Sequence, residues 1–184
     1  TGLKTSLIIT AFAVLICIVL GFIIAMIRST HDRTGKMKIL NAICKVYLTV
    51  IRGTPAMVQL LIMYYVVFAV HDPGKMITAI IAFGLNSAAY VAEIVRSGIQ
   101  SIHKGQLEAA MSLGFSKWES MVRIIIPQAI RNILPVIGNE FVTLIKESSQ
   151  VSVIGMADLM YTAATIQGIS FQPSPPLVIV AVYY

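Results

Sequence analysis

Polar side chains interrupt an apolar stretch at residues 86–93, where hydrogen-bonding and charged groups recur at helical spacing. Asn86, Tyr90 and Glu93 are separated by steps of four and three residues, so they share one face of a helix. An amide, a phenol and a carboxylate suit the binding of a small polar solute. Lipid would reject such a face, so we expect it to point at a partner helix or a water-filled cavity.

Two interpretations stay open for Asn86 and its neighbour Ser87, namely hydrogen bonds between helices and contact with a transported solute. For Glu93, which lies near the end of the apolar run, an ion pair with Arg96 is the simpler interpretation. The residue types therefore suit solute binding within a membrane.

A second polar group occurs in residues 124–145, where Glu140 follows Asn139 inside an apolar run. Pro127, Pro135 and Gly138 each weaken a regular helix there, so we expect an irregular span. Such backbone is tolerated at membrane depth only where protein or water covers it, which predicts that this span lines a transport path.

The sequence shows no motif that is typical of an enzyme active site. No G-x-x-x-x-G-K-[ST] phosphate loop is present, so this chain does not bind ATP by that motif. His31, His71 and His103 lie in three separate loops, and Cys17 and Cys44 suggest neither a disulfide nor a metal site. We expect a protein that is not an enzyme and holds no metal or cofactor.

The composition indicates an integral membrane protein, because 57% of residues are hydrophobic, only 12% are charged and the mean hydropathy is +0.84. The net charge of +6 could suggest a nucleic-acid partner. The basic residues, however, lie in loops beside apolar runs, as the positive-inside rule expects. We therefore expect a lipid bilayer and no nucleic acid.

The apolar runs predict an all-α integral membrane protein with about five transmembrane helices in a single domain, residues 1–184. The expected spans are residues 3–27, 47–70, 76–95, 124–145 and a last one from 177 that is cut short, with a short external helix at 158–167. The basic loop 28–38 is predicted to be cytoplasmic, which puts the N-terminus outside. The missing initial Met and the short last run suggest a trimmed fragment.

Arg52 lies within the second apolar region, after an expected interfacial helix at 39–46. It should either snorkel to the cytoplasmic headgroups or face the protein interior. Gly53 and Pro55 predict a local kink. Whether this kink also gates a path stays open from these residues.

Residues 104–118 predict a soluble helix between spans, ended by Gly114. Leu113 and Trp118 are among the large apolar residues that it would expose. An exposed apolar surface of this kind usually marks a contact with another protein.

This segment resembles the EAA signature of bacterial ABC-importer permeases. Glu108-Ala109-Ala110, then Gly114, then Ile124, Ile126 and Pro127 follow its spacing, with Ile126 where the family usually has Leu. In that family the signature forms the coupling helix that docks in a cleft of the ATPase subunit. The resemblance thus assigns ATPase coupling to Glu108, Ala109, Ala110, Leu113, Gly114 and Trp118.

Three further segments resemble the polar amino-acid branch of this family, the histidine, glutamine and arginine type. They are Arg52-Gly53-Thr54-Pro55 with Gln59-Leu60, then residues 88–98, and Asn139-Glu140-Phe141 with Lys146-Glu147-Ser148-Ser149, although Gln150 replaces the usual Leu. From these matches and the polar faces, we expect a substrate site at Asn86, Ser87, Tyr90 and Glu140. A gating or path role is expected for Arg52, Gly53, Thr54, Pro55, Gln59, Glu93 and Lys146.

The resemblance implies a type I ABC-importer permease for polar, possibly basic, amino acids in the bacterial inner membrane. Its implied partners are two ATP-binding subunits, a second permease copy or homologue and an extracytoplasmic solute-binding protein. The resemblance places ATP and its magnesium ion on the ATP-binding subunits. Two alternatives stay open: an ion-coupled secondary transporter or channel component, and an ABC permease for another small solute.

Overall fold

The computed structural model describes residues 2–184, apart from the side chain of Arg33. Every regular element in this described part is helical, as the composition and the length of the apolar runs predicted. The long helices are α1 (Gly2–Thr34), α2 (Lys38–Gly53), α4 (Lys75–Gln100) and α7 (Ile126–Glu147). The shorter ones are α3 (Ala56–Ile62), α5 (Lys104–Ser112), α6 (Lys117–Ser120), α8 (Leu159–Ser170) and α9 (Ser174–Tyr183), with π-helical turns at Met63–Val67 and Met121–Ile125 and a 3₁₀ turn at Ser148–Ile154.

Helix α1 continues past the end of its apolar run and reaches Thr34 before Gly35 takes a left-handed conformation with φ of 66°. The prediction of a loop from residue 28 is therefore wrong for residues 28–34. No glycine or proline precedes Gly35 in this basic segment, so nothing in it breaks the helix. As a result Arg28 and Asp32 are held on a rigid helix.

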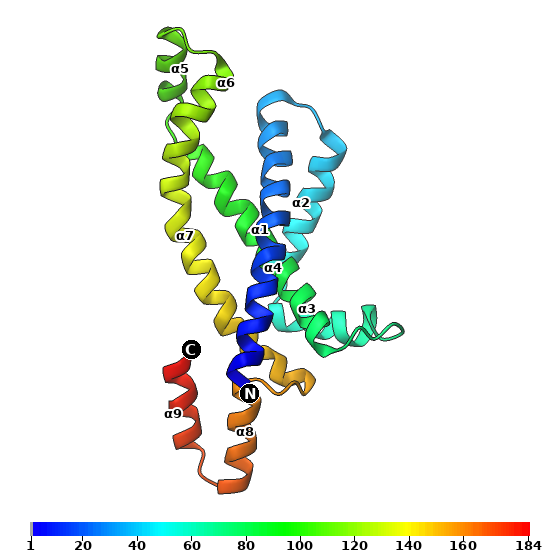
Figure 1. Cartoon of the computed structure of the whole chain (residues 1–184). Helices are drawn as coiled ribbons and strands as arrows, with labels where there is room; N and C mark the ends of the chain where they lie inside the picture. Colours follow the sequence, from blue (N-terminus) through cyan, green and yellow to red (C-terminus); the bar gives the residue numbers. More distant parts are fainter. Residues whose placement is uncertain (1) are drawn as a thin grey trace.

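The second apolar region is divided at Thr54–Pro55, where α2 and the following helical segment make an angle of 108°. The predicted kink at Gly53 and Pro55 is confirmed, but the expected division between residues 46 and 47 is wrong. Proline disfavours helical backbone in the preceding residue, and Thr54 is accordingly extended with φ of −123°. Figure 1 shows the consequence, since α3 leaves the bundle sideways instead of completing an upright span.

Helices α1 and α4 pack along most of their length through small residues (Figure 1). A β-carbon at Gly21 would lie 2.7 Å from Val91, and one at Gly84 would lie 2.9 Å from Ile16. Such contacts let two backbones approach closely, which is how helices associate where lipid supplies no hydrophobic drive. This pair forms the centre of the fold.

Helix α7 packs against α4 through Gly98 and Ile133, where an added β-carbon at the glycine would lie 2.2 Å from the isoleucine side chain. The prediction of an irregular span is wrong, because α7 is one α-helix that runs through Pro135 and Gly138. Irregular backbone lies at both ends of α7 instead. The π-helical turn Met121–Ile125 precedes the helix and the 3₁₀ turn Ser148–Ile154 follows it.

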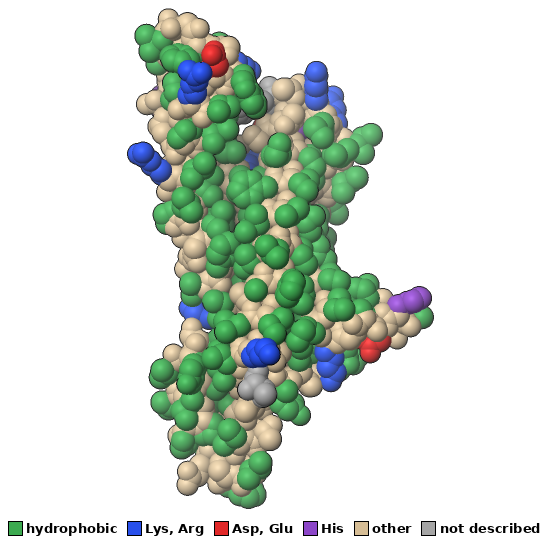
Figure 2. Space-filling model, viewed as in Figure 1, with side chains coloured by type: hydrophobic (Ala, Val, Ile, Leu, Met, Phe, Trp, Pro, Cys, Tyr) green, Lys and Arg blue, Asp and Glu red, His purple; other side chains and the backbone are tan. Residues whose placement is uncertain are grey.

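Three helical stretches are long and apolar enough to cross a membrane, or up to four if α2 and the bent segment after it count as one. These stretches are Gly2–Asp32, Lys75–Gln100 and Lys117–Ile154, and α9 is a shorter apolar helix. Figure 2 shows apolar side chains covering the middle of the molecule. The short helix predicted at residues 158–167 is confirmed as α8, with Asp158 as its N-cap.

Candidate functional site

The polar face of α4 meets α2 and α3 at Asn86, which is 2% exposed. Its side-chain amide donates a hydrogen bond to Oε1 of Gln59 at 3.0 Å. The Gln59 amide in turn donates to the carbonyl of Ile51 at 2.7 Å and to Oγ1 of Thr54 at 2.7 Å. Of the two interpretations left open for Asn86, the structure shows the hydrogen bond between helices. Gln59 thereby satisfies backbone and side-chain groups freed at the break before Pro55.

Tyr90 lies farther along the same face, half-buried, and its ring faces the guanidinium of Arg52. The distance from the Arg52 guanidinium carbon to the ring centroid is 5.7 Å, which suits a cation–π contact. Arg52 thus reaches the polar face of α4, while 44% of its side chain stays exposed.

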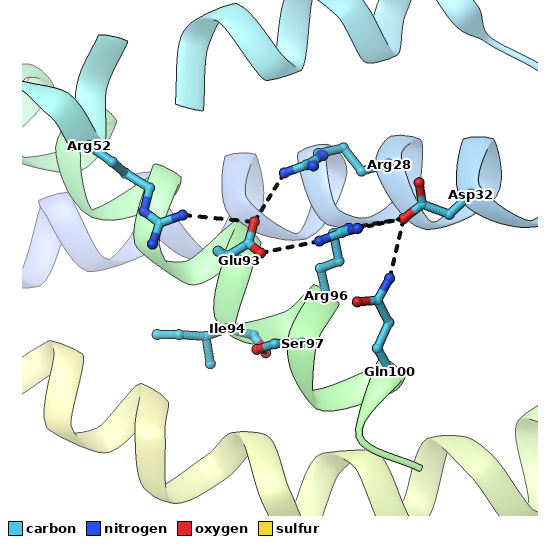
Figure 3. A network of polar contacts seen from close by, with 8 residues as sticks. All are labelled: Arg28, Asp32, Arg52, Glu93, Ile94, Arg96, Ser97 and Gln100. Carbon is cyan, nitrogen blue, oxygen red and sulfur yellow. Dashed lines mark hydrogen bonds and ion pairs between the residues drawn. The ribbon is translucent and has the colours of Figure 1, made fainter. Parts of the chain in front are cut away.

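Figure 3 shows the network at the end of this face, in which the Glu93 carboxylate forms ion pairs with arginines of three helices. The Glu93 carboxylate lies 3.0 Å from Arg28 on α1, 3.2 Å from Arg96 on α4 and 3.9 Å from Arg52 on α2. Arg96 also lies 2.9 Å from Asp32, again on α1. The predicted Glu93–Arg96 pair is confirmed.

Arg28 and Asp32 are the members that sequence reasoning missed. Both were assigned to a loop, yet they are spaced four residues apart, so in a continued helix they share one face. That spacing was the signal that could have found them.

Ser87 belongs to a different face of α4 from Asn86 and Tyr90. Its hydroxyl is fully buried and has no hydrogen-bond partner among the described residues. The carboxyl of Glu140 on α7 lies close to that hydroxyl. The expected substrate set is therefore divided between two helix interfaces, with Asn86 and Tyr90 at one and Ser87 with Glu140 at the other.

The remaining residues with an expected gating or path role lie apart from Ser87 and Glu140. Gly53, Thr54 and Pro55 form the break between α2 and α3 and are exposed. Lys146 lies exposed near the end of α7, where its carbonyl accepts from the Ser149 hydroxyl at 2.7 Å.

The segment of residues 104–118 projects from one end of the molecule as α5 and the start of α6 (Figure 1). His103 caps α5 by accepting a hydrogen bond from the backbone N–H of Gly105 at 3.1 Å. After α5 the chain turns at Gly114, whose φ of 89° favours glycine. Ser116 and Glu119 then form a capping box that starts α6. Every turn of this segment is thus fixed by local bonds.

An exposed apolar surface results, with exposed fractions of 79% for Leu113 and 75% for Trp118. Glu108 and Ala109 are exposed beside it, whereas Ala110 is buried beneath it. Of the residues assigned to coupling, all but Ala110 can therefore be reached by a partner.

A cavity of about 530 Å³ lies beneath α5 and connects this surface to the ends of α1 and α4. Its lining includes Asp32 from α1, Gln100 from α4 and Glu108 from α5. Because Asp32 and Gln100 are joined by a hydrogen bond of 3.3 Å, the cavity adjoins the Glu93 network. Helix α5 itself contacts the π-helical turn Met121–Ile125 that leads into α7.

Relatives and solved structures match nearly the whole chain. A putative glutamine transport system permease protein, GlnP, of Rickettsia prowazekii (strain Madrid E) is 39% identical over 168 residues, covering 90% of this chain and 77% of the relative. The arginine transport system permease protein ArtQ of Bacillus subtilis (strain 168) is 37% identical over 185 aligned positions, covering 100% of this chain and 82% of the relative.

Among solved structures, a chain of an amino acid ABC transporter crystallised with histidines superposes with a TM-score of 0.88 at 43% identity. The match covers 100% of this chain and 84% of that chain. The MetNI methionine ABC transporter in an inward-facing form has a TM-score of 0.76 at 18% identity over 99% of this chain and 87% of that chain, which shows a shared fold.

The family model described as binding-protein-dependent transport system inner membrane component matches residues 17–184. The all-helical bundle, its apolar surface and the projecting α5–α6 segment agree with that description. This chain therefore belongs to the family of inner membrane components of binding-protein-dependent transport systems, and it is a multi-pass permease rather than an enzyme.

Proposed function

We propose that this chain is the permease subunit of an ATP-driven importer for polar amino acids. The observation that carries the proposal is the whole-chain likeness to an amino acid ABC transporter chain, at 43% identity and a TM-score of 0.88. Relatives named for glutamine and arginine transport support the same class of substrate.

Family membership implies an ATPase and an external solute-binding protein as partners. We propose two ATPase copies and a second permease copy or homologue, because a bundle of this size can hardly enclose a solute path alone. Each ATPase would dock on the exposed surface around Leu113 and Trp118. ATP binding would move α5, and its contacts with the π-helical turn Met121–Ile125 would pass the movement to α7.

For the solute we favour the interface between α4 and α7, near Ser87 and Glu140. The Ser87 hydroxyl is buried without a hydrogen-bond partner in the described part of the chain, so a bound solute could supply one. The Glu140 carboxyl offers a negative group for the ammonium or cationic side chain of an amino acid. Asn86 and Tyr90 would shape the path from the other face of α4, where their contacts with Gln59 and Arg52 hold them in place.

The test is purification of the native complex from its own membranes in mild detergent, followed by mass spectrometry and reconstitution. We expect a co-purifying chain with a phosphate-binding loop. We also expect uptake of L-glutamine, L-arginine or L-histidine that requires ATP on the side of the membrane that carries the ATPase subunits. If the chain is purified alone and an ion gradient drives solute transport without ATP, the ion-coupled alternative is correct. ATP-driven uptake of other solutes but of no amino acid would contradict the substrate class.

A further inference from the structure

We propose that the pocket between α1, α2 and α4 binds the phosphate of an anionic phospholipid from the cytoplasmic leaflet. The pocket has a volume of about 560 Å³ and is lined by Arg28, Lys45 and Arg52, with Thr49 and Glu93 beside them. Its ligand is distinct from the transported solute, and the inference does not depend on which solute is carried.

The cations that line this pocket outnumber its acids. Glu93 is the only carboxylate in the lining, and it is already bound by Arg28 at 3.0 Å and by Arg96 at 3.2 Å. Lys45 is exposed and forms no ion pair within the described residues, and Arg52 reaches Glu93 only at 3.9 Å. An oxyanion would satisfy these donors.

The pocket lies at the depth of lipid phosphates. The uncharged part of α1 from Thr5 onward ends at Ile27, and Arg28 is the first charged residue after it. The change from apolar to charged residues marks the level at which acyl chains give way to headgroups. Basic pockets between transmembrane helices on the cytoplasmic side are typical sites for anionic lipid headgroups.

Helix α2 also offers a place for an acyl chain. Its outward face carries a shallow apolar groove of about 530 Å³, lined by Ala42, Ile43, Val46, Tyr47, Val50 and Ile51. The groove and the basic pocket occupy the same turns of α2, on different sides of the helix. Lipid around α2 would cover the apolar groove, whereas a free phosphate or a small solute would leave it uncovered.

The experiment compares lipid retention by charge-removing variants of α2. The complex from native membranes is placed in nanodiscs that hold equal amounts of phosphatidylglycerol and phosphatidylethanolamine, then released into detergent and weighed by native mass spectrometry. Lys45→Gln and Arg52→Gln should each lower retained phosphatidylglycerol about five-fold and leave phosphatidylethanolamine unchanged. Lys38→Gln is the matched control, because Lys38 is exposed on the same helix but does not line the pocket.

Three results would overturn the proposal. The first is that Lys45→Gln and Arg52→Gln retain no less phosphatidylglycerol than Lys38→Gln does. Such a result would indicate either no effect or a general effect of surface charge. The second is displacement of phosphatidylglycerol by millimolar inorganic phosphate, which would make this a site for the free ion. The third is efficient crosslinking of a Lys45→Cys variant to a second permease chain, since the pocket would then be closed by protein.

Discussion

Glu93 of α4 and Arg28 of α1 form a 3.0 Å ion pair, although 65 positions separate them in the sequence. The pair joins the two helices that form the centre of the fold, and Arg96 and Arg52 extend it along α4 and to α2. Only 14% of the Arg28 side chain is exposed, so its charge depends on this partner.

Removing the acid from this network should destabilise the protein. Glu93→Gln leaves three arginines around a neutral amide, and the half-buried geometry predicts a loss of about 1–3 kcal/mol of folding free energy. The measurement is the thermal unfolding midpoint of the purified complex. Asp72→Asn removes an exposed acid that has no ion pair in the described structure, and its amide oxygen can still accept from the Gly74 N–H, so it is the matched control. Equal midpoints for the two variants would refute the stabilising role.

The packing of α4 against α7 should be sensitive to one methyl group at Gly98. An alanine β-carbon there would lie 2.2 Å from Cγ1 of Ile133, so we expect Gly98→Ala to cost about 1–3 kcal/mol. Gly138→Ala on α7 meets nothing within 4 Å and should be neutral or slightly stabilising. The free energies of unfolding of both variants are compared with the parent. The double variant Gly98→Ala/Ile133→Ala, which removes Cγ1, should lose less than the sum of its two single variants.

Coupling to the ATPase should fail when the turn after α5 is altered. Gly114 has φ of 89°, so Gly114→Asp strains the turn and moves the exposed Leu113 and Trp118 surface. We expect insertion in the membrane to be normal and transport-linked ATP hydrolysis to be lost, as it should be in Glu108→Lys. Gly168→Asp on the exposed part of α8 is the control. Hydrolysis at the parental rate in both coupling variants would show that the segment is not the docking site.

The charge of Glu140 should determine substrate preference. Glu140→Gln removes the carboxylate near Ser87 and keeps the shape of the side chain, so uptake of L-arginine should fall at least about tenfold more than uptake of L-glutamine. Initial uptake rates in proteoliposomes over a range of solute concentrations give the maximal rate and the half-saturation concentration for each solute. Unchanged kinetics for both solutes would exclude Glu140 from the solute site.

The start of α6 should loosen in acid. The backbone N–H of Ser116 donates to the Glu119 carboxylate at 3.0 Å, and this bond holds the pKa of Glu119 below its ordinary value of 4.5. Because the folded-state pKa is the lower one, the stabilisation is present above the unfolded value and is lost as pH falls through the folded value. Amide exchange at residues 116–120 should therefore accelerate, relative to intrinsic rates, as pH is lowered below 4.5.

Glu119→Gln is the control for this effect. Its amide oxygen can still accept the hydrogen bond from Ser116, as the capping box allows, but it does not titrate in this range. Protection of the amides of residues 116–120 from exchange should therefore not change with pH in this variant. The same acid-dependent loss in both proteins would assign the effect to another group.

The sequence by itself determined the features that depend on neighbouring residues. The length and composition of the apolar runs predicted an all-helical membrane protein, because a lipid-exposed backbone must satisfy its hydrogen bonds within the helix. Pro55 predicted the break after α2, and Gly114 predicted the end of the exposed α5 segment. Capping residues and prolines act on backbone groups within about three positions, so the places where these helices begin and end do not depend on the rest of the fold.

Only the tertiary structure decided which polar groups meet. Asn86 and Ser87 are adjacent in sequence, yet they point to α3 and α7 respectively, because one residue turns a helix face by about 100°. Glu93 gained Arg28 because α1 stays helical past its apolar end, and α7 passes through Pro135 unbroken. Such outcomes depend on which helices become neighbours and how closely their small residues let them approach, and this is a property of packing between distant segments.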